Sequence, residues 1–381
     1  MKSRVSFALM MVATMLAGST FAVRHIGFET DAFNLVYPAD HEKSVIFSPL
    51  SFEVDSVLVA ESLATIPKAN VAERMGVIVG FENVYGPMLA QLSARTNGFT
   101  FVTARGFCVP EIKKSPVSHR LFLESVYGAE VMRLYPPKGA EAWFRTTMEG
   151  RMDDFTLGVN SSVANRYSFY DLAALDVEWA ERFPTKNTKR LTFTAVNGDK
   201  REFEFMADVR NADVGTNRFY QTLRLPLKND AWFFALLPNE GMSLKDARDG
   251  FSSMHIDETL LVMDSIAEPS VYHGPCVVAL PQLELDSSVD FTSIFKYFKI
   301  PTKGLIHVTG DELAAREYRQ RAAFRLKENG RNEPPLERKA PEAVIKADNS
   351  TRRMILNRPF LFFVYHRPTA TIPIAGQFTG L

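Results

Sequence analysis

The residue types most often used for catalysis are present in this chain but scattered. Its seven histidines lie far apart in the sequence, and none forms the paired spacing H-E-x-x-H that holds a zinc ion. A lone histidine is far more often structural than catalytic, and each of the seven is interpreted in that way: His25, His41, His119, His255, His273, His307 and His366.

Other sequence signatures of enzymes are also missing. The chain has no glycine-rich phosphate loop followed by Lys and Ser or Thr, no dinucleotide fingerprint and no Gly-x-Ser-x-Gly elbow. The adjacent carboxylates Asp153 and Asp154 are better explained as solvated charges, because neighbouring side chains on a helix or loop rarely face each other. We therefore predict that the protein is not an enzyme and needs no cofactor or metal.

The composition is that of a globular protein without excess charge. Of its 381 residues, 46% are hydrophobic and 30 are phenylalanine, which is enough apolar material for a large core. Lys and Arg number 44, as do Asp and Glu, and no basic stripe interleaved with aromatic residues runs along the chain. Nucleic acid is thus not expected as a partner.

The first 22 residues have the layout of a secretory signal peptide. Positive charges at Lys2 and Arg4 precede the apolar run 5–16, and small residues lead to a cleavage point near Ala22. A buried N-terminal helix and an uncleaved anchor are the alternatives, although the run is short for crossing a bilayer. We expect export to the extracellular space, or to the periplasm in a bacterium, with no membrane span after cleavage.

The two cysteines, Cys108 and Cys276, are too few for a disulfide-rich scaffold. Both lie in strand-like runs, where a buried free thiol is the simplest expectation. The hydrophobic core must then stabilise the fold without disulfides.

Local patterns indicate a mixture of helices and strands. Ser48 and Pro49 resemble a helix start, and apolar residues follow at helical spacing from Leu50 to Ala64. Asn197-Gly198 predicts a hairpin, and the run 231–237 is apolar on both faces, which predicts a central strand. Further helices are expected at 117–127 and 140–148, and strands at 101–109, 169–175, 191–196, 200–206, 223–227, 276–280, 360–365 and 372–376.

Residues 23–381 are interpreted as one domain, because no internal repeat or linker interrupts them. One segment does not resemble core: from Arg331 to Arg353 the residues are mainly charged, polar or proline, with Leu336, Val344 and Ile345 as the large aliphatic exceptions. A compact domain rarely carries so long a polar stretch without a functional reason or disorder. Function is therefore sought in this segment.

Several segments resemble one family, the serpins, in the order in which serpins carry them. The chain is similar to that family in the strand-to-helix segment 44–51, in Tyr127-Gly128-Ala129-Glu130-Val131, and in Trp179-Ala180-Glu181-Arg182-Phe183 with Lys186-Asn187-Thr188. The most specific match is Asn357-Arg358-Pro359-Phe360-Leu361-Phe362-Phe363, followed by 368–372 and Gly376.

The resemblance implies an α+β serpin fold with three β-sheets, eight or nine helices and an exposed reactive loop at about 330–356. The strand 320–326 would lead into the loop, and Gly330 takes the place of the hinge glycine. Inhibitory serpins are suicide substrates: a protease cuts the loop, which then inserts as a new central strand of the main sheet.

Insertion makes a demand that this hinge does not meet. The hinge begins Gly330, Arg331, Asn332, Glu333, Pro334, Pro335 and continues with charges to Lys339. A strand that enters a sheet buries alternate side chains and needs its backbone N–H groups, yet either alternation here would bury ions or prolines. Burying an ion costs on the order of several kcal/mol, and an unpaired buried carbonyl costs roughly 1–3 kcal/mol more.

The region under the sheet opening also departs from the family. The resemblance assigns Ser48, Ser51, Asp171, Gln320 and Trp179 to this region. Ser48 and Ser51 are retained, but Asp171 stands where serpins usually have asparagine and Gln320 where they have histidine. An equivalent structural hydrogen bond between the two is the simpler reading.

Three functions are therefore carried forward. The first is a secreted, non-inhibitory serpin-like binding module with a protein partner. The second is an inhibitor of a serine or cysteine protease, with its scissile bond near Val344-Ile345, which would suit an elastase-like enzyme. The third is a reversible inhibitor that needs no insertion. A monomer is expected, and Asn160 and Asn349 fit the N-glycosylation pattern.

Overall fold

The computed structural model describes most of the chain: residues 32, 35–36, 43–75, 80–94, 96, 98–158, 166–253, 256–265, 268–310, 312–330 and 351–381. The predicted signal peptide 1–22 and the predicted glycosylation sites Asn160 and Asn349 lie outside these residues. The same holds for the loop residues Arg331, Asn332, Glu333, Pro334, Pro335, Val344 and Ile345.

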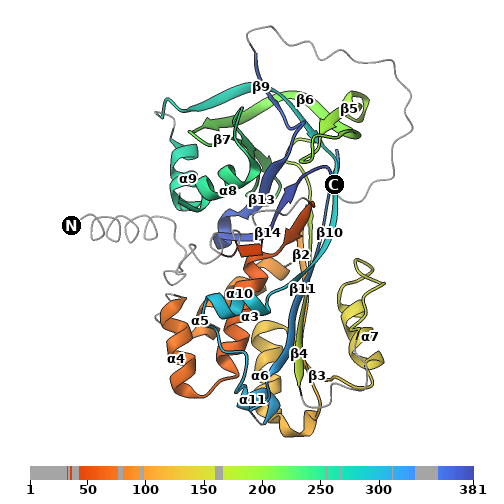
Figure 1. Cartoon of the computed structure of the whole chain (residues 1–381), viewed down its shortest axis with the longest axis vertical. Coiled ribbons are helices and arrows are strands. Elements are labelled where there is room, and N and C mark those ends of the chain that lie inside the picture. Colours follow the sequence, from red (N-terminus) through yellow and green to blue (C-terminus); the bar gives the residue numbers. More distant parts are fainter. Residues whose placement is uncertain are drawn as a thin grey trace, which may run out of the picture.

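A five-stranded sheet runs along the lower part of the molecule (Figure 1). Its middle strand is β4 (Tyr167–Val177), which is parallel to its neighbour β11 (Ala315–Leu326). On the other side, β2 (Phe99–Val109) is antiparallel to β4. The outer strands are β10 (Leu283–Asp290), antiparallel to β11, and β3 (Ala129–Arg133), parallel to β2. The sequence-predicted strands 101–109 and 169–175 are confirmed.

The second sheet has nine strands and fills the upper part of the molecule (Figure 1). In order its strands are β1 (Val45–Phe47), β14 (Thr371–Phe378), β13 (Phe360–His366), β8 (Ala231–Pro238), β7 (Tyr220–Leu227), β6 (Lys200–Thr216), β9 (Val271–Pro281) and β12 (Arg352–Ile355), with β5 (Lys189–Thr194) also paired to β6. The start of β6 pairs with β5 and its end with β7. The long strand β6 thus connects the β5 pairing to the β7 pairing. Two of the three sheets expected from the family resemblance are therefore joined into one hydrogen-bonded sheet.

Two predictions about this sheet are confirmed. The Asn197-Gly198 turn links β5 and β6, and Gly198 has the positive φ of 86° that favours glycine. Strand β8 lies between β7 and β13 and is buried along most of its length. An apolar run flanked by two strands and covered on both faces is the arrangement expected of a central strand.

Nine α-helices lie within the described ranges. They are α3 (Pro49–Glu61), α4 (Thr65–Arg74), α5 (Phe81–Ser93), α6 (Val117–Tyr127), α7 (Lys138–Thr147), α8 (Leu244–Ser253), α9 (Ile256–Asp264), α10 (Thr292–Tyr297) and α11 (Ile306–Thr309). Short 3-10 helices occur at η1 (Ile112–Lys114), η3 (Thr185–Asn187) and η4 (Arg367–Thr369). In the part of the chain that the structure describes, no helix is long and apolar enough to span a membrane.

The large core lies between the helices and both sheets. It joins α3, α5 and α6 to the inner face of the five-stranded sheet, and α8 to the nine-stranded sheet. A second apolar cluster, which includes Phe144, Tyr170 and Leu172, lies on the other face of the five-stranded sheet under α7. Cys108 and Cys276 are buried free thiols, as predicted. Burial raises the pKa of Cys276 to about 11 and that of Cys108 further, so neither is a reactive thiolate.

Candidate functional site

The candidate site begins at the buried helix α3. The side chain of Ser48 caps this helix by accepting a hydrogen bond from the Ser51 backbone N–H at 3.1 Å, and Pro49 occupies the first helical position. Every residue of α3 is buried, so its acidic side chains cannot reach water freely. Asp55 is one of them and is 2% exposed.

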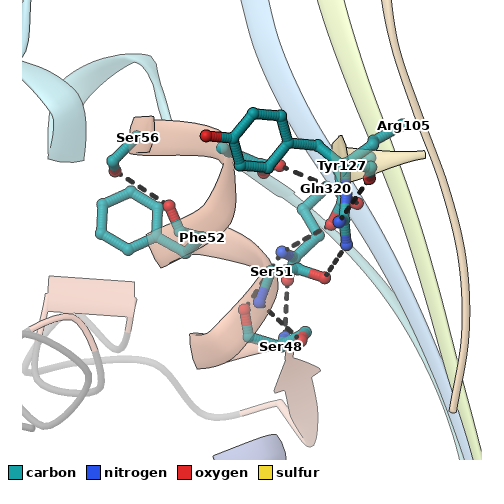
Figure 2. Close-up of polar contacts among 9 residues, drawn as sticks. Ser48, Ser51, Phe52, Ser56, Arg105, Tyr127 and Gln320 are labelled. Atoms are coloured by element: carbon teal, nitrogen blue, oxygen red, sulfur yellow. Dashed lines mark hydrogen bonds and ion pairs between the residues drawn. The ribbon is translucent and has the colours of Figure 1, made fainter. Parts of the chain in front are cut away.

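Three polar side chains from neighbouring strands face this helix. Arg105 on β2 is in register with Asp171 on β4, and Asp171 is in register with Gln320 on β11. Residues in register on adjacent strands point to the same face of a sheet. The three therefore form one buried polar row across the sheet, with each residue at most 1% exposed. Figure 2 shows Arg105 and Gln320 directed toward α3.

Gln320 ties two strands to the start of α3. Its Oε1 accepts a hydrogen bond from the Ser48 backbone N–H at 2.6 Å. Its Nε2 donates to the Ser48 carbonyl at 3.2 Å and to Asp171 Oδ2 at 3.0 Å (Figure 2). The Gln320 amide thus provides hydrogen-bond partners for the Ser48 backbone N–H and carbonyl, which are buried and cannot bond to water.

Arg105 joins the row to α3 and to the end of α6. Its Nη2 donates to Ser51 Oγ at 3.2 Å, its Nη1 to the Tyr127 carbonyl at 3.4 Å and its Nε to Asp171 Oδ1 at 3.4 Å (Figure 2). The same Nε lies 3.9 Å from Asp55 Oδ1. One guanidinium therefore serves two buried carboxyl groups.

Burial and mutual repulsion disfavour ionisation of both carboxyl groups. Burial and then the charge of Asp171 raise the pKa of Asp55 well above its ordinary value, while Arg105 opposes the shift. Burial also raises the pKa of Asp171, against the lowering effect of Arg105 and of hydrogen bonds from Arg105, Gln320 and Ser51. Asp171 is thus the better stabilised carboxylate of the two.

Sequence reasoning did not identify Arg105 or Asp55. Each carried a signal: Arg105 is a lone charge in an otherwise largely apolar strand, and Asp55 lies within a helix that is apolar for most of its length. A charged residue in a segment predicted to be core should be paired, because an unpaired buried charge is costly. The identity of the partner could not be obtained from local pattern.

The structure separates Trp179 from the other four residues assigned to the sheet opening. Ser48, Ser51, Asp171 and Gln320 lie together, whereas Trp179 lies at the end of β11 and donates from Nε1 to the Lys327 carbonyl at 2.9 Å. Its ring packs edge-on against Phe183 and Phe233. Trp179 therefore contacts the segment that leads into the loop.

The chain leaves β11 through a tightly packed turn. Gly330 bonds from its N–H to the Lys327 carbonyl at 3.1 Å and has a φ of 95°, which favours glycine. A Cβ at Gly330 would lie 2.4 Å from the Val177 carbonyl oxygen. Within this turn Glu328 accepts two hydrogen bonds from Gln282 Nε2, at 2.8 and 3.0 Å, and one from Thr188. The start of the loop is thus fixed against β4 and its neighbours.

The arrangement is suited to holding the sheet and α3 together. Ser48 and Ser51 use their hydroxyl groups in the helix cap and the Arg105 contact, deep inside the protein. Among the described residues, no three His, Cys, Asp or Glu side chains are grouped so as to hold a metal ion. The polar row and the turn at Gly330 both make contacts that link β11 to β4 and its neighbours.

Comparisons with known proteins agree with this architecture. A family model described as Serpin (serine protease inhibitor) matches residues 25–380. Human Serpin I2 is 22% identical, over 94% of this chain and 91% of that protein. The structure of native protease nexin-1 with heparin aligns with a TM-score of 0.77 at 19% identity, over 93% of this chain and 96% of that one. The thyroxine-binding globulin complex with thyroxine aligns with a TM-score of 0.77 at 14% identity, over 93% and 98% of the two chains.

Proposed function

This chain belongs to the serpin family and has the α+β serpin fold, and from that premise we propose that it is a secreted, non-inhibitory member that binds a protein partner without inserting its loop. The observation that carries the proposal is the register of the turn at Gly330, because it determines which hinge side chains an inserted strand would bury. The predicted signal peptide supports export.

The turn pairs Lys327 with Gly330 as antiparallel neighbours. If a loop strand continued this pairing along β11, Arg331 would lie opposite Leu326 and Glu333 opposite Phe324. Opposed residues of antiparallel strands point to the same face. Leu326 and Phe324 are both buried on the core side of the sheet, so the charged side chains opposite them would be buried as well.

The same register continues down the strand. Pro335 would lie opposite Ala322, Glu337 opposite Gln320 and Lys339 opposite Tyr318, all three of which are buried in β11. If the inserted strand kept this register, it would bury Arg331, Glu333, Pro335, Glu337 and Lys339, which is one of the two alternations considered from the sequence.

The energetic consequence opposes insertion. Each ion taken into the core costs on the order of several kcal/mol unless it is well paired. Pro334 and Pro335 also lack the N–H that a central strand donates to its neighbours. Insertion begins at Arg331, so the first step already carries a charge toward Leu326 and the surrounding core.

The alternative is an inhibitor cleaved near Val344-Ile345, and one observation favours it. Strands β11 and β4 are adjacent and parallel, so an antiparallel strand placed between them could form regular ladders with both. The sheet therefore has the strand arrangement that insertion needs, and the difference between the two proposals lies in the hinge.

A protease panel tests the proposal. Purified protein is incubated with serine and cysteine proteases, then run on a denaturing gel, and its melting temperature is measured before and after loop cleavage. We expect cleavage without a covalent complex and no gain in melting temperature. A band at the summed mass of protein and protease, or a large gain in melting temperature, would establish the inhibitor instead. Tight binding without a covalent band would favour the reversible inhibitor.

A further inference from the structure

The buried site beneath the five-stranded sheet contains a carboxyl oxygen without a hydrogen bond. Asp55 Oδ1 is buried, and among the described residues it has no hydrogen-bond partner. Its nearest positive charge is Arg105 Nε at 3.9 Å, which is an ion pair without hydrogen-bond contact. By contrast, both oxygens of Asp171 accept hydrogen bonds, from Arg105 and from Gln320.

The charges of this site do not balance if every group is ionised. Arg105 carries one positive charge, and Asp55 and Asp171 would carry two negative charges in the same buried space. An uncompensated buried charge is disfavoured strongly enough that the group normally becomes neutral instead. The site is neutral when one carboxyl group holds a proton. Asp171 is paired with Arg105, and both of its oxygens accept hydrogen bonds, which stabilises its ionised form. The proton therefore belongs on Asp55.

Among the described residues, the other titratable groups around Asp55 do not supply a second positive charge to it. On the sheet side these groups are Arg105, Asp171 and the phenol of Tyr318 on β11. Further along α3, Glu61 accepts a hydrogen bond from Tyr127 of α6 and forms an ion pair with Lys68 of α4. The charge of Lys68 is therefore paired with Glu61 and not with Asp55. Glu53 accepts a hydrogen bond from Tyr85 of α5 at 2.6 Å.

We propose that Asp55 is protonated at neutral pH and that Asp55, Asp171 and Arg105 form a proton-dependent latch between α3 and the five-stranded sheet. With the proton in place the site is neutral and Arg105 holds α3, β2 and β4 together. Loss of the proton leaves a net negative charge under β4, which favours entry of water and separation of the sheet from α3.

The pH dependence has a defined direction. Burial and the charge of Asp171 raise the pKa of Asp55, so the folded protein binds this proton more tightly than the unfolded chain does. Stability from this group is therefore greatest on the acidic side. It decreases as the pH rises from the ordinary aspartate pKa through the raised value in the folded protein. The latch weakens toward alkaline pH.

The test compares isosteric variants of the two carboxyl groups. Asp55→Asn imitates the protonated form and cannot ionise in the unfolded chain, so it should keep or raise the melting temperature at neutral pH. Asp171→Asn removes the anion paired with Arg105 and should lower the melting temperature clearly. Asp176→Asn, on the same strand but partly exposed and paired with Arg151, serves as the control. If Asp55→Asn lowers the melting temperature as much as Asp171→Asn, the proposal is wrong.

Two further measurements start from the wild-type protein and do not rest on changes in melting temperature. Infrared difference spectra should contain the carbonyl band of a buried protonated carboxylic acid at neutral pH, and Asp55→Asn should lose it. Hydrogen exchange of peptides from β4 and β11, corrected for the intrinsic rate, should become faster as the pH is raised. Absence of the band in the wild type, its persistence in Asp55→Asn, or pH-independent corrected exchange would each overturn the proposal.

Discussion

Gln320 on β11 lies directly opposite Asp171 on β4, and its Nε2 donates to Asp171 Oδ2 at 3.0 Å. Neighbouring strands lie about 4.8 Å apart, so an extra strand between β11 and β4 would move them roughly twice as far apart. The hydrogen bond cannot survive that separation. This contact therefore reports whether the sheet is closed.

Replacing Gln320 by leucine should loosen the closed sheet. The change leaves the Ser48 backbone N–H and one oxygen of Asp171 without this partner in a buried site. Unsatisfied buried groups cost about 1–3 kcal/mol each, so we expect a loss of roughly 2–4 kcal/mol in unfolding free energy by urea titration. Arg325→Leu is the control, because Arg325 is an exposed residue of the same strand paired with Glu284. Equal effects of the two changes would contradict the prediction.

Arg105→Met should be strongly destabilising. It removes the guanidinium that bonds to Asp171, Ser51 and the Tyr127 carbonyl, and it leaves a buried carboxylate unpaired. Breaking one side of a buried ion pair costs about 3–5 kcal/mol, so we expect a loss of that size in the unfolding free energy, which chemical denaturation measures.

Arg190→Met provides the matched control for Arg105. Arg190 is also a strand arginine paired with an acid, Glu204, but its side chain is 75% exposed. Such a surface pair contributes about 0–1 kcal/mol, so the control variant should melt near the wild-type temperature. A small effect at Arg105 would show that the buried network does not hold the sheet.

Gly330→Ala should distort the turn that leads into the loop. A methyl group there meets the Val177 carbonyl and the Glu178 backbone, and the residue must also keep a positive φ. Gly198→Ala shares the positive φ but has nothing within 4 Å of the new carbon. The difference in melting temperature between the two variants isolates the steric contact. We expect Gly330→Ala to lose at least about 1 kcal/mol more, and equal losses would contradict this.

Replacing the hinge side chains that would face the core in an inserted strand should permit loop insertion. Arg331, Glu333, Pro334, Pro335, Glu337 and Lys339 are replaced together by alanine or threonine, which removes the ions and restores backbone donors. After loop cleavage this variant should gain melting temperature, whereas the parent should not. Substituting the outward alternation, Asn332, Leu336 and Arg338, by alanine should give no gain. A gain in the parent would refute the non-inhibitory proposal.

His366 should make the protein less stable in acid. It stacks on Phe99 and bonds through Nδ1 to Thr369 Oγ1 at 2.7 Å, and burial lowers its pKa to about 4 while Asp230 opposes the shift. Below its ordinary pKa the unfolded chain takes up a proton that the folded protein resists. Stability should therefore fall by up to about 3 kcal/mol as the pH drops from about 6.5 toward 4.

Unfolding His366→Asn across this pH range checks the assignment. The variant should lose part of the acid dependence even if it is less stable at neutral pH. His119 contributes in the same direction, because burial together with the charges of His307 and Lys68 lowers its pKa to about 4. A double variant that keeps the whole wild-type acid dependence would show that neither histidine causes it.

Much of the fold could be predicted from the sequence alone. Ser48 and Pro49 start a helix, Asn197-Gly198 turns a hairpin and the apolar run 231–237 forms a central strand, because each depends on residues close together in the chain. The motifs of the last third, including Asn357 to Phe363, identified the family, and the family model supports this. The non-inhibitory function and the signal peptide stay predictions.

Only the tertiary structure placed Arg105, Asp171 and Gln320 in one row beneath α3 with Asp55 beside them. These residues come from three strands and a helix far apart in sequence, and their contact depends on strand register, since a shift of one residue would turn every side chain to the other face. Trp179 lies apart from Ser48 because it follows the end of β4 at Val177, farther along the sheet than Asp171. The tertiary structure also gave the pairing of Lys327 with Gly330, from which the register of an inserted loop strand is inferred.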